Sequence, residues 1–115
     1  MKSRHYHQSL QDIIDSAEDI EKFMAGVSLE RLTGDRKTLF AVAKALENIG
    51  EAVKQIPAAV RHKYPDVPWK DVAGMRDVLV HDYFGIDAAI VWKTVHEDLP
   101  PLKRRIADIL AAIGR

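Results

Sequence analysis

The chain has 115 residues, with 17 Lys and Arg against 17 Asp and Glu, five His and no Cys. The missing cysteine excludes disulfides, thiolate metal sites, iron–sulfur clusters and cysteine nucleophiles. A formal charge of zero gives no general attraction for nucleic acid or anionic lipid, so any such contact must come from a local patch or from several copies.

The length predicts a single domain over residues 1–115, large enough to bury about two thirds of its surface. No apolar stretch approaches the ~20 residues that cross a bilayer. The first seven residues, MKSRHYH, lack the apolar segment of a signal peptide. We therefore expect a cytoplasmic protein with no membrane contact.

Apolar residues near the N-terminus recur at steps of three and four, which predicts a long amphipathic helix. The stripe comprises Leu10, Ile13, Ile14, Ala17, Ile20, Phe23, Met24 and Val27. Gly26 weakens its end, and a short segment over 28–33 leads to Gly34. Asp35 is then expected to cap a second helix.

The second predicted helix carries the most regular seam, with apolar residues spaced as in a heptad repeat. These residues are Leu39, Val42, Leu46, Ile49, Val53 and Ile56. The seam could be the bundle core or a dimer surface, and we favour the core. Gly50, beside it, is expected to permit close approach of another backbone, since glycine inside a helix costs about 1 kcal/mol relative to alanine. Pro57 ends this helix and can open a short helical turn over 58–63.

The rest of the chain predicts three further helices. Residues 64–68 form a rigid extended loop, because each proline disfavours helix in the residue before it. A third helix runs from Trp69 towards Tyr83, Asp87 caps a fourth, and Pro100 and Pro101 separate that one from a fifth over 102–113. The predicted fold class is all-α, an antiparallel up-and-down bundle of four main helices plus short ones. Trp69 and Trp92 are expected to anchor its core.

The segment over 74–85 concentrates the reactive side chains of the chain. It places Arg76, Asp77, His81, Asp82 and Tyr83 within eight residues. Guanidinium groups hold phosphate oxygens, imidazoles exchange protons near neutral pH, and phenols donate hydrogen bonds or accept modification. On spacing alone, the simpler interpretation is a surface ion pair between Arg76 and a nearby aspartate, with a half-buried imidazole at His81.

The pattern Arg76-x4-His81-x-Tyr83 resembles the motif of HEPN domains, in the form typical of HepT-like toxins. Flanking segments resemble the same family, and the similarity extends from Leu10 to Ile113. These segments are Ile49-Gly-Glu-Ala52, Val67-Pro-Trp69, Gly74-Met-Arg76, His81-Asp-Tyr-Phe84, Val91-Trp-x-x-Val95 and Asp98-Leu-Pro100.

This resemblance implies a HEPN-like helical bundle that forms a homodimer with the two motifs at the interface. It implies a metal-independent endoribonuclease toxin, needing no cofactor, whose partner is an MntA-type nucleotidyltransferase antitoxin that attaches AMP to the motif tyrosine. Carried over, Arg76 and His81 are catalytic and Asp77 supports them. Tyr83 is both a catalytic-site residue and the modification target.

Helix geometry also favours two chains. On a regular helix, Arg76 and His81 would lie roughly 140° apart in azimuth and ~7.5 Å apart along the axis, whereas Arg76 and Tyr83 would be only ~20° apart in azimuth. One chain does not easily bring Arg76 and His81 to one phosphate, but a two-fold interface brings each residue near its symmetry mate. Cleavage through the ribose 2′-OH also needs one group to take a proton and another to give one, and a dimer offers two motif histidines. DNA lacks the 2′-OH, so this mechanism predicts RNA as the only substrate.

A different class of function stays open beside the enzyme. The bundle could be a non-catalytic module that binds a nucleotide or docks a nucleotidyltransferase, using the same polar cluster. Two small basic clusters, over 61–63 and 103–105, are ordinarily solvated faces, but in a dimer they could flank the site and guide RNA.

Overall fold

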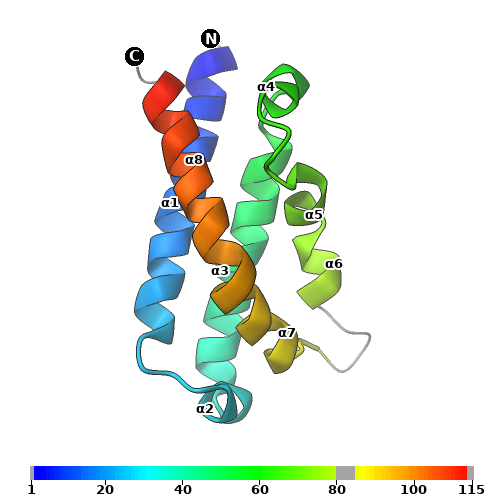
Figure 1. Cartoon of the computed structure of the whole chain (residues 1–115). Helices are drawn as coiled ribbons and strands as arrows, with labels where there is room; N and C mark the ends of the chain where they lie inside the picture. The colour runs from blue at the N-terminus through cyan, green and yellow to red at the C-terminus, as the bar shows by residue number, and fades with distance from the viewer. Residues whose placement is uncertain (1, 80–84, 114–115) are drawn as a thin grey trace.

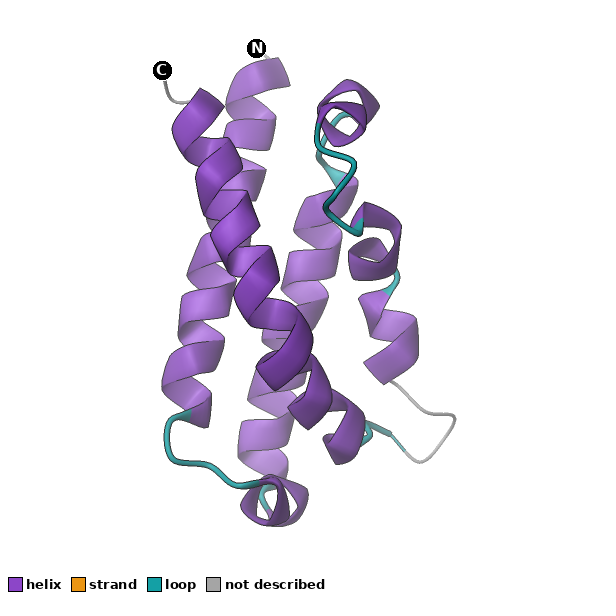
Figure 2. Ribbon diagram, viewed as in Figure 1, coloured by secondary structure: helices purple, strands orange, loops and turns teal. Residues whose placement is uncertain are grey.

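The computed structural model describes residues 2–79 and 85–113, without the side chains of residues 2–5, Arg76 and Val78. Within these ranges the chain consists of helices and loops and has no extended strand (Figure 2). Four antiparallel rods form a bundle whose two termini lie at the same end (Figure 1). The first three rods are α1 (Lys2–Met24), α3 (Arg36–Lys54) and the pair α5 (Trp69–Ala73) and α6 (Met75–Leu79). The fourth joins α7 (Ala88–Lys93), the π-helical turn η2 (Thr94–Asp98) and α8 (Leu99–Ile113).

Two short helices cap the bundle at opposite ends (Figure 1). α2 (Leu29–Gly34) connects α1 to α3, and α4 (Ala58–Lys63) follows α3 near the termini. The all-α up-and-down bundle predicted from the sequence is thus confirmed. Among the described residues, no helix combines the length and the hydropathy that a bilayer crossing requires.

α1 buries the inner part of its predicted stripe against α3 and α8. Its fully buried residues are Leu10, Ile13, Ala17 and Ile20, with Met24 nearly so. Phe23, predicted to belong to the stripe, is instead 44% exposed. The buried positions alternate steps of three and four, so the residue before Met24 lies about 100° away from the seam.

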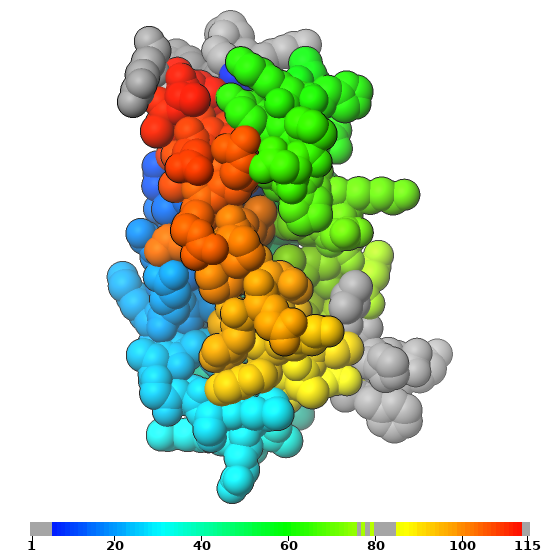
Figure 3. Space-filling view, viewed as in Figure 1, coloured from blue at the N-terminus to red at the C-terminus, as the bar shows by residue number. Residues whose placement is uncertain are grey.

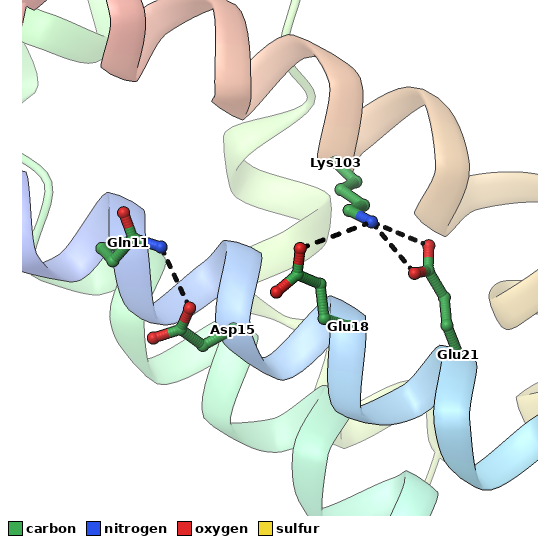
Figure 4. A network of polar contacts seen from close by, with 5 residues as sticks. All are labelled: Gln11, Asp15, Glu18, Glu21 and Lys103. Atoms are coloured by element: carbon green, nitrogen blue, oxygen red, sulfur yellow. Dashed lines mark hydrogen bonds and ion pairs between the residues drawn. The ribbon is translucent and has the colours of Figure 1, made fainter.

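A lysine clamp links the outer faces of α1 and α8 (Figure 4). The Nζ atom of Lys103 lies 2.9 Å from Oε1 of Glu21 and 3.9 Å from Oε2 of Glu18. All three side chains are at least partly solvated, so the clamp contributes little stability and mainly fixes how the helices are aligned.

α3 is the central rod, and its start and its seam agree with the sequence prediction. The Asp35 carboxylate accepts hydrogen bonds from the Thr38 backbone N–H at 3.1 Å and from the Thr38 hydroxyl at 2.7 Å. All six seam residues are buried, none more than 7% exposed. The seam is therefore the core of the bundle and not a dimer surface.

Gly50 allows the backbone of another helix to approach α3 closely. A β-carbon built on Gly50 would lie 3.0 Å from the carbonyl oxygen of Val72 and 3.5 Å from that of Ala73. The predicted close approach of another backbone is confirmed, and the neighbour is α5, the helix that precedes the reactive segment.

Pro100 and Pro101 do not separate two helices, contrary to the prediction. α7 continues through η2 into α8, and both prolines lie in the first turn of α8. Proline lacks an N–H donor, and its ring clashes with the carbonyl four residues earlier in an α-helix. The wider π turn, in which the Leu99 N–H donates to the Thr94 carbonyl, carries the rod past the prolines.

The two tryptophans are buried to different degrees. Trp69 is 7% exposed and donates its Nε1–H to the Tyr64 carbonyl at 3.0 Å, so it anchors the core as predicted. Trp92 is only half-buried, and its ring stacks on His96 with centroids 3.9 Å apart. Trp92 packs against the core with one part of its ring and leaves the rest near the surface.

Candidate functional site

The reactive segment begins in α6 and leads towards α7. Asp77 lies in α6 and is exposed, and its supporting role stays a prediction. Arg76 belongs to the same helix, with its side chain outside the description. His81, Asp82 and Tyr83 lie outside the described residues, so their predicted roles and relative positions stay predictions.

Two buried side chains fix α6 in the bundle. Met75 is 8% exposed and Leu79 is 1% exposed, and both belong to the core cluster. Residues four apart share one face of a helix, so this pair turns α6 towards the core. The exposed Asp77, midway between them, lies on the opposite face.

Gly74 divides the helix that the sequence predicted as one. α5 ends at Ala73, and α6 begins at Met75. The Gly74 N–H donates to the Lys70 carbonyl at 3.0 Å. The Gly74 carbonyl accepts from the Asp77 backbone N–H at 3.1 Å, a bond over three residues that is tighter than the four-residue step of an α-helix. Arg76 is therefore placed by the separate helix α6, whose anchors are Met75 and Leu79, and not by the helix that starts at Trp69.

One backbone hydrogen bond connects the two sides of the reactive segment. The Asp87 N–H donates to the Leu79 carbonyl at 3.2 Å. The Asp87 side chain also accepts from the backbone N–H groups of Ala89 at 2.9 Å and Ile90 at 3.2 Å, which makes it the N-cap of α7, as predicted. Asp87 thus links the end of α6 to the start of α7. Two residues before it, Gly85 has a φ of 90°, a backbone conformation that favours glycine.

The second basic cluster, over 103–105, is partly committed to ion pairs. Lys103 binds the α1 carboxylates, and Arg105 pairs with Asp66 and lies 5.3 Å above the Tyr64 ring. The hydrogen bond from Arg105 holds the pKa of Asp66 below its usual value. These two cations are therefore held in place by the bundle, which makes them poor candidates for a mobile RNA guide.

The first basic cluster lies in α4. Arg61 is half-buried, and its Nε atom is buried with no hydrogen-bond partner in the described part of the chain. His62 and Lys63 are exposed. Guidance of RNA by this cluster stays a prediction. The described residues contain no group of three or more His, Asp or Glu side chains that could hold a metal ion.

The sequence did not reveal a cavity of about 510 Å³ beside α6. Its walls come from residues 66–75 on one side and residues 94–105 on the other. In the sequence, the pair Pro100-Pro101 indicated irregular backbone near one wall. It did not indicate the π turn over Thr94–Asp98, which contributes residues to that wall. We call this cavity the α5–α8 cleft.

Comparison with known proteins identifies the family. Residues 13–109 match the model of the family described as Ribonuclease HepT-like, and this range includes the whole reactive segment. No solved structure matches the chain.

Several curated relatives are similar over nearly their full length. A protein of Thermococcus cleftensis named "Probable ribonuclease HepT" is 47% identical over 106 residues, which cover 92% of this chain and 96% of the relative. A "Putative RNase" of Methanocaldococcus jannaschii is 40% identical over 113 residues, covering 98% and 93%. Another "Putative RNase", from Caldanaerobacter subterraneus subsp. tengcongensis, is 40% identical over 101 residues, covering 88% and 90%. The chain belongs to the HepT-like ribonuclease family.

Proposed function

We propose that the protein is the toxin of a toxin–antitoxin pair and acts as a metal-independent endoribonuclease. The observation that carries this proposal is the pattern Arg76-x4-His81-x-Tyr83 within a chain that belongs to the HepT-like ribonuclease family. The relatives that cover nearly the whole chain are named as ribonucleases, which supports RNA as the substrate.

The reaction breaks the bond between phosphorus and the 5′ oxygen of the next nucleotide. The ribose 2′ oxygen attacks phosphorus as its proton passes to one imidazole, and a second acid protonates the departing 5′ oxygen. The products are a 2′,3′-cyclic phosphate and a 5′-OH, with no net change in protons. The Arg76 guanidinium stabilises the charge that builds on the non-bridging oxygens. DNA has no 2′-OH and is not cut.

The proposed active site is composite, at a homodimer interface. One chain offers a single motif imidazole, His81, while the reaction needs a base and an acid. A two-fold interface between reactive segments supplies a second His81 and a second Arg76. The exposure of Asp77 on α6 supports an accessible face next to Arg76.

Inhibition is proposed to act through Tyr83. A partner nucleotidyltransferase of the MntA type transfers AMP from ATP to the phenol oxygen, with release of pyrophosphate. The new phosphodiester brings negative charge and bulk into a cleft that binds the anionic RNA backbone, so substrate is repelled. Incubation with the partner and ATP should add AMP to the wild-type chain and not to Tyr83→Phe. Label on another residue would remove Tyr83 from this role.

The experiment for the proposed activity is RNA cleavage in EDTA by wild type, Arg76→Ala and His81→Ala. Arg31→Ala and His96→Ala are matched controls, because both residues are exposed and lie outside the reactive segment and outside both basic clusters. We expect the two motif variants to lose activity by at least about 100-fold while keeping the helical circular dichroism spectrum, and the controls to retain activity. Wild type that binds nucleotide but never cuts RNA would instead support the non-catalytic module.

A further inference from the structure

The α5–α8 cleft has an apolar floor between two rods of the bundle. The floor is formed by buried side chains from both walls, namely Val67, Val72, Met75, Leu99 and Leu102. Figure 3 shows this face of the molecule, where the orange atoms of α8 lie beside the green atoms of residues 58–75. A volume of about 510 Å³ is in the range of pockets that bind ligands or partner side chains.

The rim of the cleft is acidic. Four carboxylates and one guanidinium line it, and Asp66 pairs with the guanidinium of Arg105. The remaining three, Asp71, Glu97 and Asp98, are exposed and form no ion pair with any described residue. The cleft therefore presents three carboxylates that have no ion-pair partner among the described side chains of residues 2–79 and 85–113, around an apolar floor.

Specific contacts involve residues of both walls. The Asp66–Arg105 ion pair connects the loop before α5 to α8 at one end of the cleft. The wall formed by residues 94–105 includes Thr94, Glu97 and Asp98 from the π turn. The Thr94 hydroxyl donates to the Ile90 carbonyl at 2.8 Å, so its proton is not available to a ligand in the cleft. Single π turns occur frequently at functional sites.

We propose that the α5–α8 cleft docks a segment of a partner protein in which lysine or arginine side chains flank aliphatic ones. The aliphatic side chains bind the floor, and the cations lie against Asp71, Glu97 and Asp98. The long stems of lysine and arginine suit a site with an apolar floor and an acidic rim. The same charges repel nucleic acid and phosphate, so the rim favours a cationic protein segment over RNA as the occupant. The inference does not depend on the proposed ribonuclease activity.

The test uses a fluorescent synthetic peptide of about 15 residues, with Leu at steps of three and four and Lys on both sides of that stripe. A second peptide replaces every Lys with Glu. Polarisation titrations measure binding to the full chain, and amide chemical shifts locate it. The cleft variant combines Asp71→Asn, Glu97→Gln and Asp98→Asn. Its matched control combines Asp12→Asn, Asp19→Asn and Glu30→Gln, three exposed carboxylates elsewhere.

We expect the lysine peptide to bind with a dissociation constant below about 100 μM and the glutamate peptide not to bind. The cleft variant should bind at least about 10-fold more weakly, while the control binds as wild type does. Shift changes should centre on Val72, Met75 and Leu102. Equal binding of both peptides, equal weakening in the control variant, or shifts centred elsewhere would overturn the proposal. Dimers of wild type that dissociate in the cleft variant, with no peptide binding, would overturn it too by making a second copy the occupant.

Discussion

Gly50 of α3 lies so close to the Val72 carbonyl of α5 that the space between the two helices has no room for a side chain. A β-carbon on Gly50 would lie 3.0 Å from the Val72 carbonyl oxygen. Because α5 leads through Gly74 directly into α6, this contact sets how deeply the first part of the reactive segment lies against the central rod.

Gly50→Ala is expected to destabilise the protein although alanine favours helix. Forcing α5 outward costs about 1–3 kcal/mol, and the gain in helix propensity offsets about 1 kcal/mol of it. We expect a net loss of about 1 kcal/mol and a fall in Tm of about 4 °C by circular dichroism. At Gly34, where a built β-carbon meets nothing within 4 Å, alanine should leave Tm unchanged or raise it. Equal effects at both positions would refute the close-approach account.

Asp87→Ala is expected to loosen the start of α7. The carboxylate caps Ala89 and Ile90, and loss of an N-cap costs about 1 kcal/mol. Asp87→Asn keeps an acceptor oxygen and should retain most of that stability. Amide hydrogen exchange gives the most local measurement, since the Ala89 and Ile90 N–H groups should exchange faster in Asp87→Ala only. Unchanged exchange in that variant would exclude the cap.

Acid should weaken the start of α3 through Asp35. The side-chain and backbone hydrogen bonds from Thr38 hold the pKa of the Asp35 carboxyl below its ordinary value of 3.8. A carboxyl whose folded pKa is lowered contributes stability that is present above its unfolded pKa and is lost as pH falls through the folded one. Asn also caps helices but does not titrate, so Asp35→Asn should show a smaller fall in Tm than wild type between about pH 5 and pH 2. Parallel curves for the two proteins would contradict this.

Periodicity predicted most of the fold because burial follows it. The seam from Leu39 to Ile56 and the caps at Asp35 and Asp87 depend on residues within a few positions of one another, and all were confirmed. Phe23 was placed wrongly because Phe23 and Met24 follow Ile20 by three and four residues, so either could continue the stripe, and in the structure Met24 is the buried one.

The interruptions of the helices were not predictable in the same way. Gly74 and the pair Pro100-Pro101 both mark irregular backbone, yet the first divides a helix and the second does not. After Gly74, the buried side chains of Met75 and Leu79 anchor α6 as a separate helix. Before the prolines, the π turn η2 continues directly into α8. The α5–α8 cleft depends on segments about 30 residues apart, which local patterns do not relate.

The proposed site residues come from the sequence and its resemblance to a family motif, not from contacts in the fold. Arg76, His81 and Tyr83 were proposed because their spacing resembles the family motif, and the family match spans all three positions. Their roles stay predictions. The hydrogen bond between Leu79 and Asp87 was not predictable, because it joins residues whose side chains do not take part in it.

The most direct test of the composite site mixes two inactive proteins. Chains carrying Arg76→Ala and chains carrying His81→Ala are unfolded together, refolded and assayed for RNA cleavage in EDTA, with native mass spectrometry to count mixed dimers. Our account predicts that each variant alone is inactive and that the mixture regains cleavage in proportion to the mixed dimers. A mixture that contains mixed dimers and still cuts no RNA, beside an active wild type, would contradict it.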